Sequence, residues 1–157
     1  KIIEIAHQYK VPVVVDPKKK NFSLYKNVDF FKPNFKEITD GLNISIEKNE
    51  TSIQEAVAKL KEKLDVKNVL LTLSEMGMYI DFESEKHFIP TNVKSVADVS
   101  GAGDTVISVA SILYALNVNP KELGDIANVA GGLVCEQLGV VPIDKDLFME
   151  RLISKNT

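Results

Sequence analysis

Short apolar runs alternate with helical patterns along the 157 residues of this chain. The runs at 11–15, 28–31 and 69–73 contain few polar residues, which is typical of strands that are covered on both faces of a parallel sheet. Helical patterns lie between and around these runs, at 1–9, 34–40 and 51–64. This alternation predicts an α/β domain with a mainly parallel sheet, and the length suits one domain.

The second half of the chain continues the pattern. Two runs at 78–82 and 86–89 predict a hairpin that turns around residues 83–85. Three more helices are expected: one after the glycines near residue 102, one from 120 or 121 to 138, and one from 144 to 152. Caps are expected at Thr51 and Asp144, and Gly41 is expected to stop the helix before it.

Composition excludes several function classes. Hydrophobic residues make up 45% and charged residues 26% of the chain, with a formal net charge of -3. These values are ordinary for a globular protein and predict no nucleic-acid or anionic-membrane partner. No apolar run approaches the roughly 20 residues that a membrane span needs. One cysteine, Cys135, excludes an intrachain disulfide and favours a cytoplasmic location.

The segment Asp98-Val99-Ser100-Gly101-Ala102-Gly103-Asp104 carries the strongest chemical signal. A glycine-rich turn that opens a helix leaves backbone N–H groups without intrahelical partners, and the helix dipole favours an anion there. A carboxylate beside that anion can accept the proton of an incoming hydroxyl. Phosphoryl transfer needs both features.

Three other polar segments follow expected strands, at 16–18, 34–37 and 72–77. In open α/β sheets, ligands bind outside the carboxyl ends of the strands. We therefore expect these segments and the glycine turn to serve one site.

Together these segments resemble the PfkB family of carbohydrate kinases. The glycine turn is similar to the family signature Asp-Thr-x-Gly-Ala-Gly-Asp, with Val99 in place of the threonine. Asn34-Phe35-Lys36-Glu37 is similar to the family's Asn-x-x-Glu motif, and 72–77 to its Thr-x-Gly-x-x-Gly strand end, with Ser74 in place of a glycine. The resemblance implies a ribokinase-like three-layer α/β/α sandwich, of which residues 1–157 would be the C-terminal, ATP-binding portion.

The resemblance also implies roles in catalysis. Asp104 would be the catalytic base, and Gly101, Ala102 and Gly103 would offer N–H groups to the transferred phosphoryl group. Asn34 and Glu37 would hold Mg²⁺, largely through water.

It further implies residues that bind ATP. Thr72, Ser74 and Gly77 would line the region of the ATP phosphates and ribose. Asn128 and Gly131 would lie by the adenine.

Each motif also has a purely structural interpretation. Asn34 and Glu37 suit a helix cap and a first-turn acid. Ser74 suits a turn, Gly131 and Gly132 suit close helix packing, and the three lysines at 18–20 suit a solvated surface. The glycine turn alone could be a tight strand-to-helix connection whose acid favours the dipole.

Val99 and Ser74, with the loop at 16–18 and the stretch Lys32-Pro33-Asn34, resemble the bacterial heptose 7-phosphate kinase branch. That branch makes heptose 1,7-bisphosphate for lipopolysaccharide core synthesis. The implied ligands are ATP, Mg²⁺ and a sugar phosphate, and a homodimer is expected for the full-length protein. The alternatives are a kinase for another sugar or a nucleoside, and a non-catalytic nucleotide-binding fragment. Because Lys1 falls inside an expected helix, we expect the N-terminal half and lid to be absent and the isolated chain to be poorly active.

Overall fold

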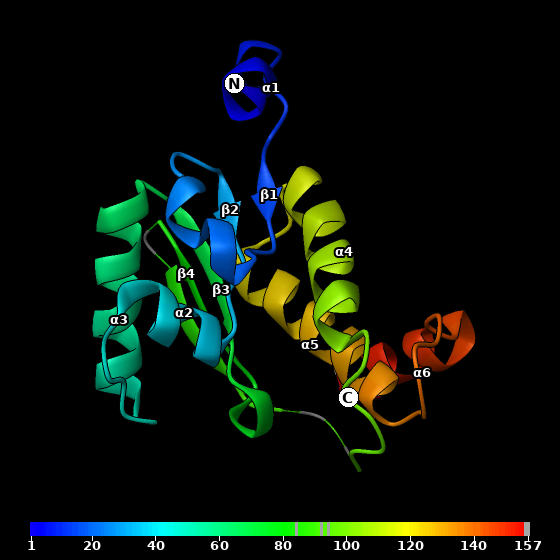
Figure 1. Cartoon of the computed structure of the whole chain (residues 1–157). Coiled ribbons are helices and arrows are strands. Elements are labelled where there is room, and N and C mark those ends of the chain that lie inside the picture. Colours follow the sequence, from blue (N-terminus) through cyan, green and yellow to red (C-terminus); the bar gives the residue numbers. More distant parts are fainter. Residues whose placement is uncertain (84, 92, 94, 156–157) are drawn as a thin grey trace. The chain divides into compact units, whose positions relative to one another are not determined.

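Among the residues that the structure describes, five strands form one sheet in the order β1-β2-β3-β4-β5. The structure is a computed structural model that describes residues 1–83, 85–91, 93 and 95–155 (Figure 1). The strands are β1 (Val14–Val15), β2 (Phe30–Phe31), β3 (Asn68–Thr72), β4 (Met78–Phe82) and β5 (Glu85–Ile89).

The sheet is mixed. β1 pairs with β2 and β2 with β3 in parallel, with Val14 opposite Phe30 and Phe31 opposite Val69. The connections from β3 to β4 and from β4 to β5 are too short for a parallel crossover, so these neighbours run antiparallel. The predicted hairpin is thus present, although Ser84 of its turn lies outside the described residues.

The chain divides into two compact units, of which the first comprises residues 1–74 and 79–88. It contains α1 (Ile2–Gln8), the 3₁₀ helix η1 (Lys19–Leu24), α2 (Phe35–Leu42) and α3 (Glu50–Leu64). α2 and α3 lie together on one side of the strands (Figure 1). α3 buries the apolar face that the sequence predicts, formed by Ile53, Val57, Leu60 and Leu64.

Three local predictions in this unit are wrong. β1 contains only two residues, and Val13, Val14 and Val15 are half-buried because β1 is an outermost strand of the sheet. α2 continues through Gly41 to Leu42, and its C-cap residue Asn43 has a left-handed φ of 53°. The cap of α3 is Asn49, whose side chain accepts a hydrogen bond from the Ser52 N–H, so Thr51 lies inside the helix.

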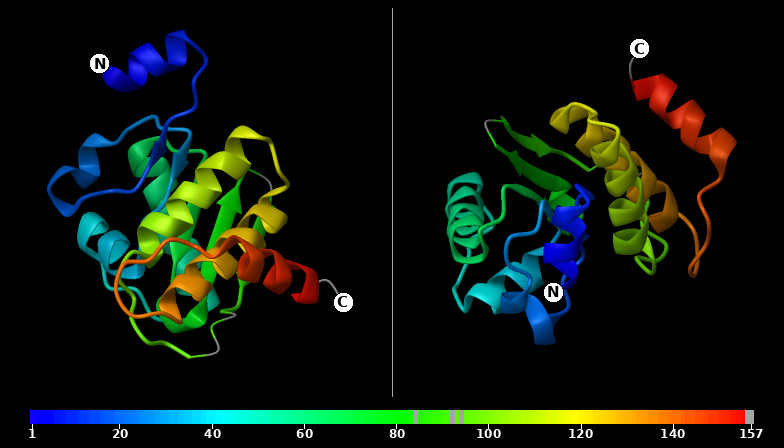
Figure 2. Two further views of the ribbon diagram at one scale, coloured as in Figure 1. Left: turned by 90° about the vertical axis from the view of Figure 1, so that its right-hand side faces the viewer. Right: turned by 90° about the horizontal axis from the view of Figure 1, so that it is seen from above.

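The second unit comprises residues 75–78 and 89–157. Its helices are α4 (Ala102–Ala115), α5 (Pro120–Cys135) and α6 (Lys145–Lys155), and the 3₁₀ turn η2 (Ser74–Met76) joins the units. α4 and α5 pack closely side by side (Figure 2). The Asp144 carboxylate caps α6 through the Leu147 N–H, as predicted, but α5 ends three residues before 138 and α6 runs beyond 152.

Within the residues that the structure describes, no helix has the length and hydropathy needed to cross a bilayer.

Candidate functional site

β2 is extended at its carboxyl end by Lys32, Pro33 and Asn34. The Lys32 N–H donates to the Val15 carbonyl at 2.8 Å, and the Thr72 N–H donates to the Pro33 carbonyl at 3.1 Å. Asn34 and Thr72 then form a parallel β-bridge. The structure therefore places these two predicted site residues side by side, at the sheet edge where ligands of α/β proteins bind.

Asn34 and Glu37 form a reciprocal capping box at the start of α2. The Glu37 N–H donates to Asn34 Oδ1, and the Asn34 N–H donates to Glu37 Oε2, both at 2.8 Å. The helix-cap interpretation of this motif is confirmed. The box fixes the Glu37 carboxylate at the helix start and uses one of its two oxygens.

Glu37 and Asn34 differ in how well they suit Mg²⁺. Among the described residues, no three acidic, histidine or cysteine side chains gather as a metal cluster. Mg²⁺ keeps several waters and commonly uses one or two carboxylates together with substrate phosphates. The second oxygen of the half-buried Glu37 carboxylate fits that requirement. Asn34 already accepts a hydrogen bond at its oxygen and fits less well as a direct ligand.

A buried lysine lies beside this edge. Lys32 is only 3% exposed, and its ammonium lies 2.7 Å from the Asp16 carboxylate. Lys18 contacts the other oxygen of Asp16 at 3.3 Å and Lys19 pairs with Asp40, but both lysines are largely exposed. The loop at 16–18 lies at this edge, as the sequence predicts. Lys32 was expected only as part of the stretch that precedes the Asn34 motif, and its burial and its ion pair with Asp16 were not predicted. The sequence signal for the burial of Lys32 is its position directly after two phenylalanines of an expected buried strand.

Ser74 and Gly77 both have left-handed backbones. Ser74 is the second residue after β3 and has a φ of 53°. Gly77 has a φ of 86°. A Cβ on Gly77 would lie 2.1 Å from the Ile89 carbonyl oxygen and 2.6 Å from the Thr91 nitrogen, so glycine is required there. Ser74 belongs to the first unit and Gly77 to the second.

In the second unit the glycine turn opens α4, as the sequence predicts. Gly101 is the N-cap residue with φ 79°, and Asp104 lies in the first turn with an exposed side chain. The Ala102 N–H donates to the Val99 carbonyl at 3.3 Å, so it closes the turn. The N–H groups of Gly103 and Asp104 are the first-turn donors that a helix leaves without intrahelical partners.

Asp98 stabilises the entry to this turn. Its Oδ1 accepts hydrogen bonds from the Ser100 hydroxyl at 2.8 Å and the Ser100 N–H at 3.0 Å. These bonds, with the Ser100 hydroxyl contributing most, lower the pKa of the Asp98 carboxyl.

Asn128 and Gly131, the two residues expected near adenine, make packing contacts on α5. The buried Asn128 donates from Nδ2 to the Pro90 carbonyl at 2.6 Å. A Cβ on Gly131 would lie 2.6 Å from Cγ2 of Val106 on α4. The close-packing interpretation of Gly131 is therefore confirmed. An adenine contact remains a prediction.

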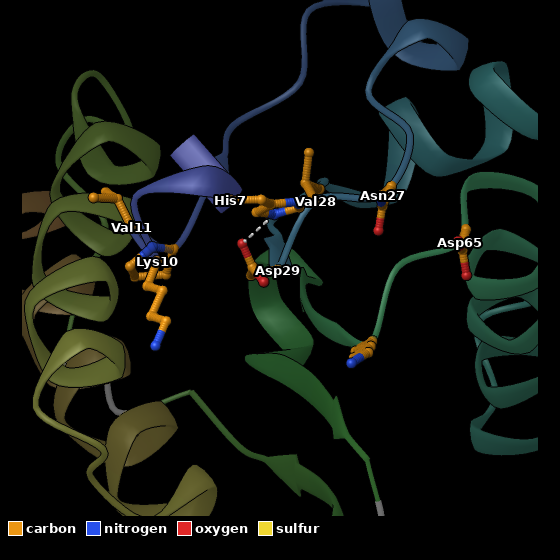
Figure 3. Close-up of a pocket in the computed structure, with 9 residues that line it drawn as sticks. His7, Lys10, Val11, Asn27, Val28, Asp29 and Asp65 are labelled. Carbon is orange, nitrogen blue, oxygen red and sulfur yellow. Dashed lines mark hydrogen bonds and ion pairs between the residues drawn. The ribbon is translucent and has the colours of Figure 1, made fainter. Parts of the chain in front are cut away.

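A separate cavity of about 370 Å³ lies at the opposite, amino ends of β1 to β3 (Figure 3). His7 contacts Asp29 Oδ2 there at 3.0 Å, and the Val13 N–H donates to the same oxygen at 2.7 Å. Lys10, Asn27 and Asp65 also line the cavity. None of the predicted site residues does.

Comparisons with known proteins agree on one family. The model of the pfkB family carbohydrate kinases matches residues 1–146. A relative described as bifunctional protein HldE, from Aliarcobacter butzleri, is 46% identical over 151 residues, which are 95% of this chain and 31% of that protein.

Solved structures agree on the fold. Arabidopsis thaliana ribokinase complexed with ribose and ATP matches with a TM-score of 0.84 at 23% identity, over 96% of this chain and 50% of that one. Phosphofructokinase-2 from Escherichia coli matches with a TM-score of 0.87 at 17% identity, over 99% and 51% of the two chains. The predicted ribokinase-like α/β fold is confirmed, and the chain spans about half of these structures.

Proposed function

Because this chain belongs to the pfkB family of carbohydrate kinases, we propose that it contributes to ATP-dependent transfer of a phosphoryl group to a hydroxyl of a sugar or sugar phosphate. The observation that carries the proposal is the glycine turn that opens α4 with Asp104 in its first turn. Helix-start N–H groups stabilise the charge of a transferred phosphoryl group, and the adjacent carboxylate is suited to accept a hydroxyl proton.

Asp104 is the proposed catalytic base. The N–H groups of Gly103 and Asp104 are the proposed donors to the phosphoryl group, supported by Gly101, whose left-handed φ sets the turn. Ala102 contributes less than expected because its N–H already donates to Val99. A loose transition state requires little early proton removal, so most of the rate enhancement is assigned to the donors and the metal.

Glu37 is the proposed link to Mg²⁺, which would neutralise charge on the ATP phosphates when bound. The capping box with Asn34 orients the carboxylate, and Thr72 lies beside Asn34 through the β-bridge. Lys32 lies buried near the same edge, with its ammonium paired to the Asp16 carboxylate. Ser74, Gly77, Asn128 and Gly131 remain the proposed lining of the nucleotide site.

Heptose 7-phosphate is the proposed acceptor, giving heptose 1,7-bisphosphate for ADP-heptose and lipopolysaccharide core synthesis. Two observations support it: Val99 and Ser74 depart from the general family pattern as that branch does, and the relative described as bifunctional protein HldE is 46% identical. Other sugars, sugar phosphates and nucleosides are the competing acceptors.

The test is a coupled ADP-release assay of the full-length protein against a panel of sugars, sugar phosphates and nucleosides. We expect Asp104→Asn to lower kcat by orders of magnitude while the KM for ATP changes little. Asp146→Asn is the matched control, because Asp146 is also an exposed first-turn acid, on α6. Equal kcat for Asp104→Asn and the parent would exclude the catalytic base.

Glu37→Gln tests the metal role separately from the cap. A glutamine oxygen can still accept the Asn34 N–H, so the capping box and the stability should be retained. We expect the Mg²⁺ concentration for half-maximal rate to rise about tenfold, since one carboxylate charge is lost. An unchanged Mg²⁺ requirement would assign Glu37 to the cap alone.

A further inference from the structure

The cavity at the amino ends of β1 to β3 is formed by the three connections that lead into these strands, which follow α1, η1 and α3 (Figure 3). All of its lining residues belong to the first unit. Pockets that hold small molecules have volumes of about 300–1,000 Å³, and this cavity of about 370 Å³ falls in that range. The cavity can therefore hold a small metabolite, at the end of the strands opposite to Asn34 and Thr72.

The middle of the cavity contains a hydrogen-bonded pair. His7 Nε2 lies 3.0 Å from Asp29 Oδ2, and the Val13 N–H donates to the same oxygen at 2.7 Å (Figure 3). Nδ2 of the buried Asn68 donates to the Asp29 carbonyl at 2.9 Å. These bonds fix Asp29 and stabilise its negative charge within the protein, so this carboxylate does not require a cation from a ligand.

Three further charged side chains line the cavity: Lys10, Asp65 and Lys67. Within the part of the chain that the structure describes, none of the three forms a hydrogen bond or an ion pair through its side chain. Two free ammonium groups and one free carboxylate give this set a net positive charge, which favours an anion. Lys10 and Asp65 lie on opposite sides of His7 and Asp29 (Figure 3), so a ligand that spans the cavity meets a cation at one end and a carboxylate at the other.

The backbone is left-handed at one lining residue in each of the three connections. Lys10 and Asn27 have a φ of 56°, and Asp65 has a φ of 52°. Glycine adopts this conformation without strain, whereas lysine is poorly suited to it. Each connection nevertheless places a polar side chain there, and all three side chains line the cavity. A polar side chain at a position where glycine would be less strained indicates that the side chain itself is used.

We propose that this cavity is a second ligand site, which takes a small phosphorylated sugar or polyol. Lysine ammonium groups bind phosphate as point charges, and the two free lysines supply them. The Asp65 carboxylate and the Asn27 amide oxygen are acceptors suited to the hydroxyl groups of the ligand. The site contains none of the residues assigned to phosphoryl transfer, so the inference is independent of the proposed function.

The experiment follows binding at His7 in the full-length protein. The imidazole NMR signals of His7 are assigned by comparison with His7→Gln, and they report on the middle of the cavity. Inorganic phosphate and ribose 5-phosphate are titrated separately at constant ionic strength. We expect both to shift the His7 signals, and ribose 5-phosphate to bind more tightly because its hydroxyl groups add hydrogen bonds.

Two lysine variants test the phosphate contact. Lys10→Gln and Lys67→Gln should each raise the dissociation constant of both probes about three- to tenfold, because each removes one charge-assisted contact. Lys26→Gln is the matched control, since Lys26 is an exposed lysine of the same connection as Asn27 but does not line the cavity. Its dissociation constants should equal those of the parent.

Asp65→Asn tests the hydroxyl contact. Asparagine tolerates the left-handed backbone at the end of α3, so the fold should be retained. We expect ribose 5-phosphate to lose most of its advantage over inorganic phosphate, because a carboxylate acceptor is replaced by a neutral amide.

Each result decides the proposal. It is overturned if neither probe moves the His7 signals at millimolar concentration, or if the two lysine variants bind as tightly as the parent. Equal affinities of the parent for the two probes overturn the assignment to a sugar phosphate. Failure to transfer phosphate to any acceptor would exclude the proposed function and leave these binding results unchanged.

Discussion

Replacement of Gly131 by alanine separates helix packing from nucleotide binding. Gly131 lies in α5 beside α4, and the added Cβ would lie 2.6 Å from Cγ2 of the buried Val106. Carbon atoms in contact are separated by about 3.5–4.0 Å, so α4, α5 or Val106 must shift by about 1 Å.

Two opposing terms set the magnitude. Alanine is favoured over glycine inside a helix by about 1 kcal/mol. Overpacking of a close-packed core costs about 1–3 kcal/mol. We expect Gly131→Ala to lower the free energy of unfolding by about 1 kcal/mol. Val106→Ala alone should cost about 2 kcal/mol, because it removes two methyl groups from a buried site.

The informative measurement is a double-mutant cycle by urea denaturation of the full-length protein. In the Val106→Ala background the new methyl group has room, so Gly131→Ala should become neutral or stabilising, with a coupling of about 1–2 kcal/mol. Gly132→Ala is the control, since its Cβ would meet Val93 at 3.3 Å and require a smaller shift.

Activity then tests the adenine prediction for Gly131. If the residue serves packing alone, the double variant should recover the KM of the parent for ATP. A raised KM that persists in the stable double variant would show a nucleotide contact. Equal unfolding free energies for Gly131→Ala and the parent would refute the steric argument.

Three further outcomes can be measured. Ser74→Gly should stabilise the protein by up to about 1 kcal/mol in urea denaturation, because Ser74 has a left-handed φ of 53°. Lys61→Met should cost about 3–5 kcal/mol, since it removes the closer cation of Asp81, which is 2% exposed, and adding Asp81→Leu should recover much of the loss. Folding lowers the pKa of Asp98, so the stability that this carboxylate contributes is present above about pH 4 and is lost as the pH falls through its folded-state pKa. Asp98→Asn should therefore make the free energy of unfolding fall less steeply with pH below about pH 4, as measured by urea denaturation.

The elements that the sequence predicts correctly are those whose hydrophobic pattern is formed by residues close together in the chain. β4 matches the predicted 78–82, a short and mostly apolar run that is buried throughout, and α3 buries the predicted face of its 3.6-residue pattern, because both signals depend only on neighbouring residues. β1 was predicted too long and too buried. Its valines indicate a strand, but burial of an outer strand depends on what lies beside it, which a local pattern does not contain.

Residue roles that depend on long-range contacts were missed for the same reason. Lys32 is buried because Asp16, sixteen positions earlier, lies at the end of the neighbouring strand. Asp98 was read as part of a signature, but its bond to Gly139 joins residues 41 positions apart. The motif predicts that Asp98 lies at the turn, and only the structure shows its hydrogen bond to the segment that follows α5.

Asn34 and Glu37 show why the structural and functional interpretations of a motif need not exclude each other. The capping box uses Glu37 Oε2 and Asn34 Oδ1, so it accounts fully for the spacing of three residues. The same two bonds fix the Glu37 carboxylate before any ligand arrives, which would lower the entropic cost of engaging a hydrated Mg²⁺ through its other oxygen in the proposed function. In that function the cap would also serve as a preorganised metal contact, and a substitution that preserves the cap but removes the charge distinguishes the two contributions.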